Sequence, residues 1–165
     1  MRERQASPGG RRAREFEAFV AGAAGRLLHI ATLLTAEAPD DNPRARRLLT
    51  LALAHTYASW DRLRGEDPYA HTRERLAGRF AHEAWYRRGG RARRQLSGAL
   101  AALTPQERLI AVLRLYEGMA EDQTAALLGL PADRVRILCD RAVVALARPA
   151  YRPAPAVRGP EVAPS

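Results

Sequence analysis

The most chemically informative residues lie on one predicted helix late in the chain, and they could contact nucleic acid. If Val135, Leu138 and Ala142 face inward, the helical period turns seven residues outward. These are Ala132, Asp133, Arg134, Arg136, Ile137, Asp140 and Arg141. The arginines can donate to guanine edges or phosphates, whereas the aspartates must accept from cytosine amino groups or repel the backbone. The mixed charges favour selective binding over indiscriminate binding.

The stretch from Glu121 to Ala142 predicts a helix-turn-helix that would present this helix. Ala125 is small enough for two helices to cross closely, Gly129 can take the left-handed conformation that ends the first helix, and Pro131 suits the first turn of the second. A helix-turn-helix places its second helix in the major groove of DNA. The alternative is a tight helical hairpin that only shares this spacing.

The composition narrows the class of partner. All 27 basic residues are arginine and the formal net charge is +9, so the chain is expected to bind polyanions. The absence of lysine also fits the codon bias of a GC-rich genome. The single cysteine, Cys139, excludes an internal disulfide and a cysteine zinc cluster. The histidines show no metal-ligand spacing, and neither a Gly-rich phosphate loop nor a recognisable nucleophile is present. We therefore expect no metal, no cofactor and no enzymatic activity.

The sequence also bears on location. No run of apolar residues approaches the roughly 20 needed to cross a membrane, and the Arg-rich start lacks the apolar stretch of a signal peptide. We therefore expect a soluble, cytoplasmic protein without a membrane contact.

Apolar periodicity predicts an all-α fold that begins with three helices. The first is expected over Arg14–Thr35. Asn42 can cap the second helix, which starts at Pro43, and Gly65 follows its end. Asp67-Pro68 repeats the start signal for the third. Strand signals are nearly absent, and we expect these helices to form a first module over residues 13–88.

A second small module is expected over residues 98–148, after a short basic linker at 89–97. The linker arginines are Arg91, Arg93 and Arg94. Thr104-Pro-Gln-Glu107 is a capping box that starts a helix running to about Glu117. The apolar face expected to pack against the helix-turn-helix consists of Leu109, Val112, Leu113 and Tyr116. The chain ends, residues 1–12 and 149–165, are rich in Arg, Pro, Gly or Ala and are expected to be disordered.

Several stretches, taken in order, match a known family. They are Tyr57, Trp60-Asp-Arg-Leu63, Asp67-Pro68, Ala70, and the run from Leu103-Thr-Pro-Gln-Glu-Arg108 to Ala142. Together they resemble an extracytoplasmic-function sigma factor, an initiation subunit of bacterial RNA polymerase. The resemblance implies that the first module binds the polymerase clamp and melts the downstream promoter element, and that the second reads the upstream element as duplex. The implied partners are promoter DNA, RNA polymerase core and an anti-sigma factor.

By position, the resemblance places promoter melting on the far half of the third helix. The residues are Arg79, His82, Trp85, Tyr86, Arg87 and Arg88. Aromatic rings can stack on an unpaired base while neighbouring arginines hold phosphates. The alternative is that Trp85 lies in the core and the arginines form a solvated face.

The resemblance places the polymerase contact at the start of the second helix. The residues are Arg47, Leu48, Leu49 and Thr50. Members of that family have acidic residues at this position, so Arg47 reverses a charge. At an interface, such a reversal can reduce the binding free energy by several kcal/mol. The linker between the two modules is also short, reaching at most ~30 Å.

Three hypotheses for the function follow. The protein is a working alternative sigma factor, or a sigma-like DNA-binding regulator or accessory subunit that does not engage polymerase independently, or an interaction protein whose DNA contact is incidental.

Overall fold

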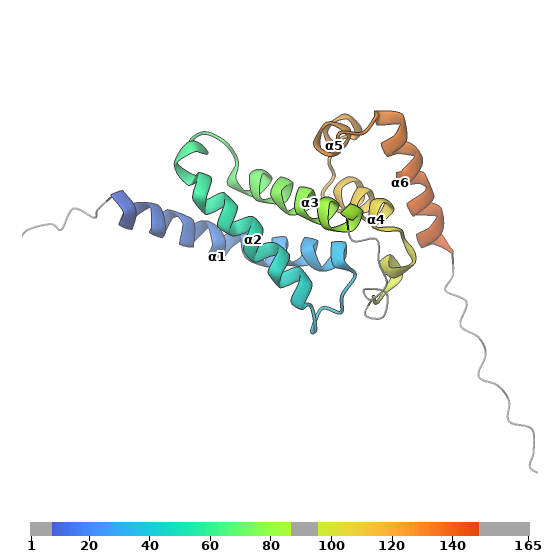
Figure 1. The fold of residues 1–165 in the computed structure, drawn as a ribbon, viewed down its shortest axis with the longest axis horizontal. Helices are drawn as coiled ribbons and strands as arrows, with labels where there is room; N and C mark the ends of the chain where they lie inside the picture. Colours follow the sequence, from blue (N-terminus) through green and yellow to red (C-terminus); the bar gives the residue numbers. More distant parts are fainter. Residues whose placement is uncertain (1–7, 87–95, 149–165) are drawn as a thin grey trace, which may run out of the picture.

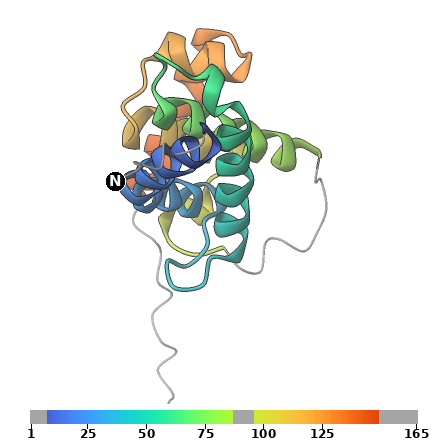
Figure 2. The ribbon, with the colours of Figure 1, turned by 90° about the vertical axis from the view of Figure 1, so that its left-hand side faces the viewer.

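A computed structural model describes residues 8–86 and 96–148, and every regular element in these ranges is helical. In chain order they are α1 (Pro8–Thr35), α2 (Pro43–Ser59), the 3-10 turn η1 (Trp60–Arg62), α3 (Pro68–Tyr86), the 3-10 turn η3 (Ala99–Ala102), α4 (Pro105–Ala111), the π-helical turn η4 (Val112–Tyr116), α5 (Glu121–Leu128) and α6 (Ala132–Ala147). The predicted all-α class is confirmed. Helices α1–α3 lie side by side, and α4–α6 pack at one end of them (Figures 1 and 2). Residues 1–7 and 149–165, which were expected to be disordered, lie outside the described residues. Most of the predicted basic linker, residues 89–97, also lies outside them.

Helix α1 starts earlier than expected, at Pro8 instead of Arg14. Its first turns are held by Arg12, which donates to the Asp61 carboxylate at 3.1 Å and to the Tyr57 carbonyl. The Arg12 guanidinium also lies 4.4 Å from the centre of the Tyr57 ring. Residues 8–12 were expected to be disordered, and that expectation is wrong because these contacts with η1 and the end of α2 hold the helix there.

The apolar character of α1 is also greater than expected. By length and composition, Gly9–Thr35 is the one helix among the described residues that could cross a membrane, so the expectation of no such run is wrong. A core helix of a soluble protein meets the same criterion. Leu27, Ile30 and Leu34 are fully buried in a cluster with residues of the other helices. Packing in the core therefore accounts for the apolar side of α1.

The start of α2 is capped by Glu37, not by Asn42 as expected. The Glu37 carboxylate accepts hydrogen bonds from the backbone amides of Arg44 and Ala45, at 3.1 and 2.8 Å. An acidic group is favoured at this end of a helix because the free amides and the helix dipole attract negative charge. The Asn42 side chain instead donates to the Thr32 hydroxyl at 2.9 Å, which ties the loop to α1.

Helices α2 and α3 pack as an antiparallel pair through apolar side chains of the core. Leu76 and Phe80 of α3 are buried. The hydroxyls of Thr56 and Thr72 form a hydrogen bond of 2.9 Å near the turn that connects the two helices. This bond satisfies two buried polar groups without a charge, so it fixes how the two helices align.

The end of α4 and the start of η4 are buried on every side, which the sequence pattern did not predict. Six consecutive residues, Arg108–Leu113, are each at most 3% exposed. Those that pack into the core of α1–α3 are Leu109, Val112 and Leu113. Ile110 instead packs against α5 and α6. The face expected to contact the helix-turn-helix packs mainly into the core of α1–α3, and Leu127 and Leu128 of α5 pack against the same cluster. Tyr116, assigned to that face, is 42% exposed.

A buried carboxylate joins the segment after η4 to α1 and α3. The Glu117 side chain, only 1% exposed, accepts from Arg26 of α1 at 2.9 and 3.1 Å. It also accepts from Arg73 and from the Tyr69 hydroxyl of α3, at 3.2 and 3.0 Å. Because burying a charge is costly unless it is paired, this set of contacts favours one docking position.

Arg108 makes a second polar connection in the same interface. Its guanidinium donates to the Leu34 carbonyl at the end of α1, at 3.1 Å. It also donates to the carbonyls of Leu100 and Leu103, both at 3.0 Å. Burial and the nearby charge of Arg44 lower the pKa of Arg108. Leu34 carries one of the last carbonyls of α1, which have no partner within that helix, so Arg108 acts as a cap from the far half of the chain.

Removing the Leu113 side chain should weaken the fold strongly, because Leu113 is fully buried where α4 meets α1–α3. We expect Leu113→Ala to lower the free energy of unfolding by about 2–5 kcal/mol. Leu115→Ala is the matched control, since Leu115 is 55% exposed, and should change it by about 0.5 kcal/mol or less. Urea unfolding of both variants measures this, and equal losses would contradict the described burial.

Raising the pH should weaken the contacts around Glu117. Burial, and then the charge of Glu117, raise the pKa of Tyr69 to about 12. The folded state therefore holds the phenol proton more tightly than the unfolded state, and this stabilisation, complete below about pH 10, is lost between pH 10 and 12. Unfolding measured over this range should show a steeper loss for the natural chain than for Tyr69→Phe. The same loss of stability with pH in both proteins would contradict the raised pKa of Tyr69 in the folded state.

Candidate nucleic-acid interface

Helices α5 and α6 form the predicted helix-turn-helix. Gly129 ends α5 in the left-handed conformation, with φ of 64°, and the Leu130 amide closes the turn on the Ala125 carbonyl at 3.0 Å. A side chain at this φ is strained, so glycine is needed at Gly129. Pro131 precedes the first residue of α6. The signals for this turn are local, and they were read correctly from the sequence.

The underside of α6 is anchored on α4. Val135 and Leu138 are buried with Ile110 of α4 and Ala125 of α5. The start of α4 is fixed by the predicted capping box: the Thr104 amide donates to the Glu107 carboxylate at 3.0 Å, and the Glu107 amide donates to the Thr104 hydroxyl at 3.3 Å. The orientation of α6 therefore depends on a helix that is itself locked into the core.

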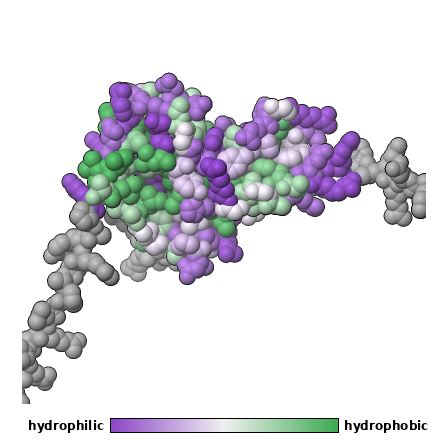
Figure 3. All heavy atoms as spheres, turned by 180° about the vertical axis from the view of Figure 1, so that it is seen from behind, coloured by the Kyte–Doolittle hydropathy of each residue, from purple (hydrophilic) through white to green (hydrophobic). Residues whose placement is uncertain are grey.

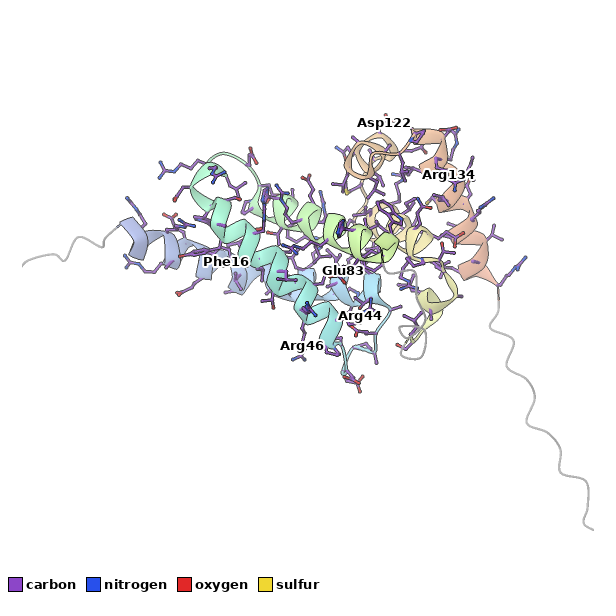
Figure 4. The ribbon with its side chains drawn as sticks, in the orientation of Figure 1. Phe16, Arg44, Arg46, Glu83, Asp122 and Arg134 are labelled. Atoms are coloured by element: carbon purple, nitrogen blue, oxygen red, sulfur yellow. The ribbon has the colours of Figure 1, made fainter. Side chains whose placement is uncertain are left out.

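The outward face of α6 is close to the predicted one. The exposed members of the predicted set are Asp133, Arg134, Arg136, Ile137, Asp140 and Arg141. Ala132 is only partly exposed because it packs against the buried cluster beneath α6. Arg134 lies near the start of α6, far from Phe16 of α1 (Figure 4). Three arginines on an exposed helix can donate to base edges and phosphates.

Apolar residues on α6 and η4 add a surface that the charge pattern did not predict. Exposed large apolar side chains in this part of the chain are Leu115, Tyr116, Ile137, Val143 and Val144. Seen from behind, hydrophobic residues gather over the end of the molecule formed by the C-terminal helices (Figure 3). Cys139 is partly buried beside this face, and burial raises the pKa of its thiol, which fits a packing role.

The residues predicted to melt DNA divide between two hollows on α3. Arg79 and His82 line one hollow with His55 of α2. Burial, and then the charge of Arg75, lower the pKa of His55 below its ordinary value. Trp85 lines a different groove. The side chain of Tyr86 and all of Arg87 and Arg88 lie outside the described residues.

The groove at Trp85 brings together residues from distant parts of the sequence. Trp85 is 43% exposed, so the alternative that it belongs to the core is wrong. The same groove is lined by Thr104 at the start of α4 and by Arg134 and Arg141 of α6. The end of α3 therefore lies beside α6. The sequence offers no signal for this placement, since Trp85 and Arg134 are far apart along the chain.

The predicted polymerase-binding segment is only partly on the surface. Leu48 and Leu49 are 4% and 8% exposed and pack in the core. Arg47 and Thr50 are exposed on the outer side of α2. A partner docking on this side of α2 would therefore meet Arg47 and Thr50 and not the two leucines.

Comparison with known proteins agrees with this architecture. Residues 99–148 match the family model described as "Sigma-70, region 4". The chain is also 30% identical over 154 residues to RNA polymerase sigma-E factor from Streptomyces coelicolor, an alignment that covers 80% of this chain and 84% of the relative. No solved structure matches the chain. Sigma factors are not enzymes, which confirms the expected absence of enzymatic activity. The chain therefore belongs to the family of RNA polymerase sigma factors and resembles its extracytoplasmic-function type.

Proposed function

We propose that this protein is an alternative sigma factor that binds RNA polymerase core and directs transcription initiation at specific promoters. Membership of the sigma-factor family supports the assignment, and the exposed arginines on the second helix of a helix-turn-helix carry it. Such a protein acts in the cytoplasm, where core polymerase is found.

The upstream promoter element would be read by α6. Arg134, Arg136 and Arg141 would donate to guanine edges and phosphates, and Ile137, which is 43% exposed, could contact a thymine methyl group. Asp133 and Asp140 would reject sites that place phosphates or guanine oxygens against them. This mixture of charges supports sequence preference over uniform attraction to DNA.

The downstream element would be melted and held by α3. Trp85 offers an exposed ring for stacking on an unpaired base, and Arg79 and His82 lie exposed on the same helix. We propose the same role for Tyr86, Arg87 and Arg88, which follow directly in the sequence. Arg91, Arg93 and Arg94 would add contacts with the phosphate backbone.

We propose contacts with proteins on two surfaces. Polymerase core would meet the outer side of α2 at Arg47 and Thr50, with Leu48 and Leu49 supporting that side from the core. An anti-sigma factor is a further proposed partner, and the exposed apolar residues of η4 and α6 offer it a contact. We also propose that residues 13–88 and 98–148 are two modules of the chain, which share the core that Leu109, Val112 and Leu113 enter.

A second candidate is a sigma-like regulator or accessory subunit that reads DNA without engaging polymerase independently. This candidate is favoured by Arg47, an exposed cation at a position where members of the family have acidic residues. A reversed charge repels a partner surface built for an acid.

Substituting Arg136 should distinguish sequence-specific DNA binding from nonspecific attraction to the DNA backbone. If Arg136 contacts a guanine edge, Arg136→Ala should weaken binding to the preferred duplex by about 1–3 kcal/mol and relax one base position. Arg14→Ala is the matched control, because it removes the same charge from an exposed site near Phe16, far from α6 (Figure 4). Duplex selection from a random pool with each variant gives the answer. Equal losses on preferred and random duplexes for Arg136→Ala would contradict base reading.

Polymerase binding decides between the two candidates. At near-physiological salt, which screens nonspecific attraction, the full chain should retain purified bacterial core polymerase in a pulldown. A chain that fails to bind while Arg47→Asp binds would favour the accessory-subunit candidate and contradict the first.

A further inference from the structure

We propose that the groove between the end of α3 and α6 binds a nucleotide, with the base stacked on Trp85 and the phosphate held by arginines of α6. The groove has walls from the N-terminal half, residues 8–86, and from the C-terminal half, residues 96–148. This role for Trp85 rests on the stacking part of the proposed function and is independent of duplex reading by α6.

The groove has the dimensions of a site for one small ligand. Its volume is about 310 Å³, at the lower end of the roughly 300–1,000 Å³ typical of ligand pockets. Trp85 lines it from the end of α3 and Gln106 from the start of α4, whereas Arg134, Leu138 and Arg141 line it from α6. Leu138 is only 3% exposed, so it forms an apolar floor between the two arginines.

Trp85 gives the groove a surface on which a planar ring can stack. Its side chain is 43% exposed although it lies between two packed helices. Every nucleic-acid base has a planar π-face, so an exposed aromatic ring binds bases with little regard to their identity. The amide of Gln106 can both donate to and accept from the edge of a stacked base.

Arg134 and Arg141 supply the positive charge that a phosphate requires. Both are exposed on α6, and their positions lie about two helical turns apart on the side that faces the groove. Among the residues that the structure describes, neither forms an ion pair. Their guanidinium groups can therefore bind phosphate oxygens, which match the planar fork of arginine.

The acidic residue that lines the groove is already engaged. The Glu107 carboxylate accepts from the amide and the hydroxyl of Thr104, at 3.0 and 2.8 Å. Its single negative charge is outnumbered by the two arginines. The groove therefore favours an anion over a cation.

The chemistry of the lining selects a nucleotide over simpler ligands. An inorganic anion would leave the ring of Trp85 without a partner, and an uncharged aromatic ligand would leave the two arginines without one. A base joined to a phosphate uses both. The nucleotide could be a free nucleoside phosphate or one unit of a single strand, since both present the same base and phosphate.

Fluorescence of Trp85 tests this site in the full chain. The chain has two tryptophans, so Trp60→Phe leaves Trp85 as the only one and keeps a ring beside Phe16 and Phe19. At near-physiological salt, ribonucleoside monophosphates or a short oligothymidylate should quench Trp85 saturably, after correction for absorption by the bases. Inorganic phosphate and uncharged nucleosides should bind about tenfold or more weakly. Equal affinity for the monophosphate and the strand would indicate a free nucleotide, and binding of the strand alone would indicate single-stranded nucleic acid.

Substitutions on α6 show whether the groove is the site. Arg134→Gln or Arg141→Gln should weaken the quenching by about fivefold or more. Arg136→Gln is the matched control, because it removes the same charge from an exposed position of α6 that does not line this groove. It should change the affinity by less than about twofold.

Three results would overturn the nucleotide site. They are the absence of saturable quenching, equal binding of inorganic phosphate, and an equal loss in Arg136→Gln and Arg134→Gln. Trp85→Phe, which leaves Trp60 beside Phe16 and far from Arg134 (Figure 4), should show no quenching by the same probes. Duplex selection and the polymerase pulldown use other probes, so a chain that fails in both and still shows the quenching would lose the proposed function and keep this site.

Discussion

The structure depends on one buried segment that spans the end of α4 and the start of η4. From Arg108 to Leu113 every side chain is enclosed, with Leu109 and Leu113 directed into the core of α1–α3 and Ile110 into the helix-turn-helix. An isolated helix as short as α4 is unstable in water, so α4 exists because both halves of the chain bury it. The same burial fixes α6, whose underside rests on Ile110.

The buried charges around α4 give this packing its specificity. Apolar contact between the halves favours association but discriminates weakly between neighbouring registers. Glu117 and Arg108 discriminate strongly, because each loses its hydration on burial and is compensated only when its hydrogen-bond partners in the protein are in place. Glu117 needs Arg26, Arg73 and Tyr69, and Arg108 needs free carbonyls at the end of α1 and beside η3. A shift of either half would leave these groups unpaired, so the interface has one preferred arrangement.

The features that could be predicted from the sequence are those whose residues lie close together along the chain. The Thr104 capping box and the Gly129 turn involve residues three to five apart, and both were predicted. Asn42 was assigned the cap of α2 on residue type, whereas Glu37 supplies it from the preceding loop. The partners of Glu117 lie 44 to 91 residues away, so no pattern reveals them. The alternative that placed Trp85 in the core is wrong because helical spacing alone cannot show that this side of α3 lines a groove.

Hydrogen exchange of the full chain under native conditions tests most directly whether one core unites the two halves. Amides exchange through openings whose free energies reveal cooperative units. If α4 is the shared centre, the amides of Leu109–Leu113 and those of Leu27–Leu34 should exchange through the same opening, with equal free energies and equal dependence on urea. A lower-energy opening that exposes the amides of α4 and α6 while α1 stays protected would contradict the account, because the C-terminal half would then unfold without disturbing the N-terminal core.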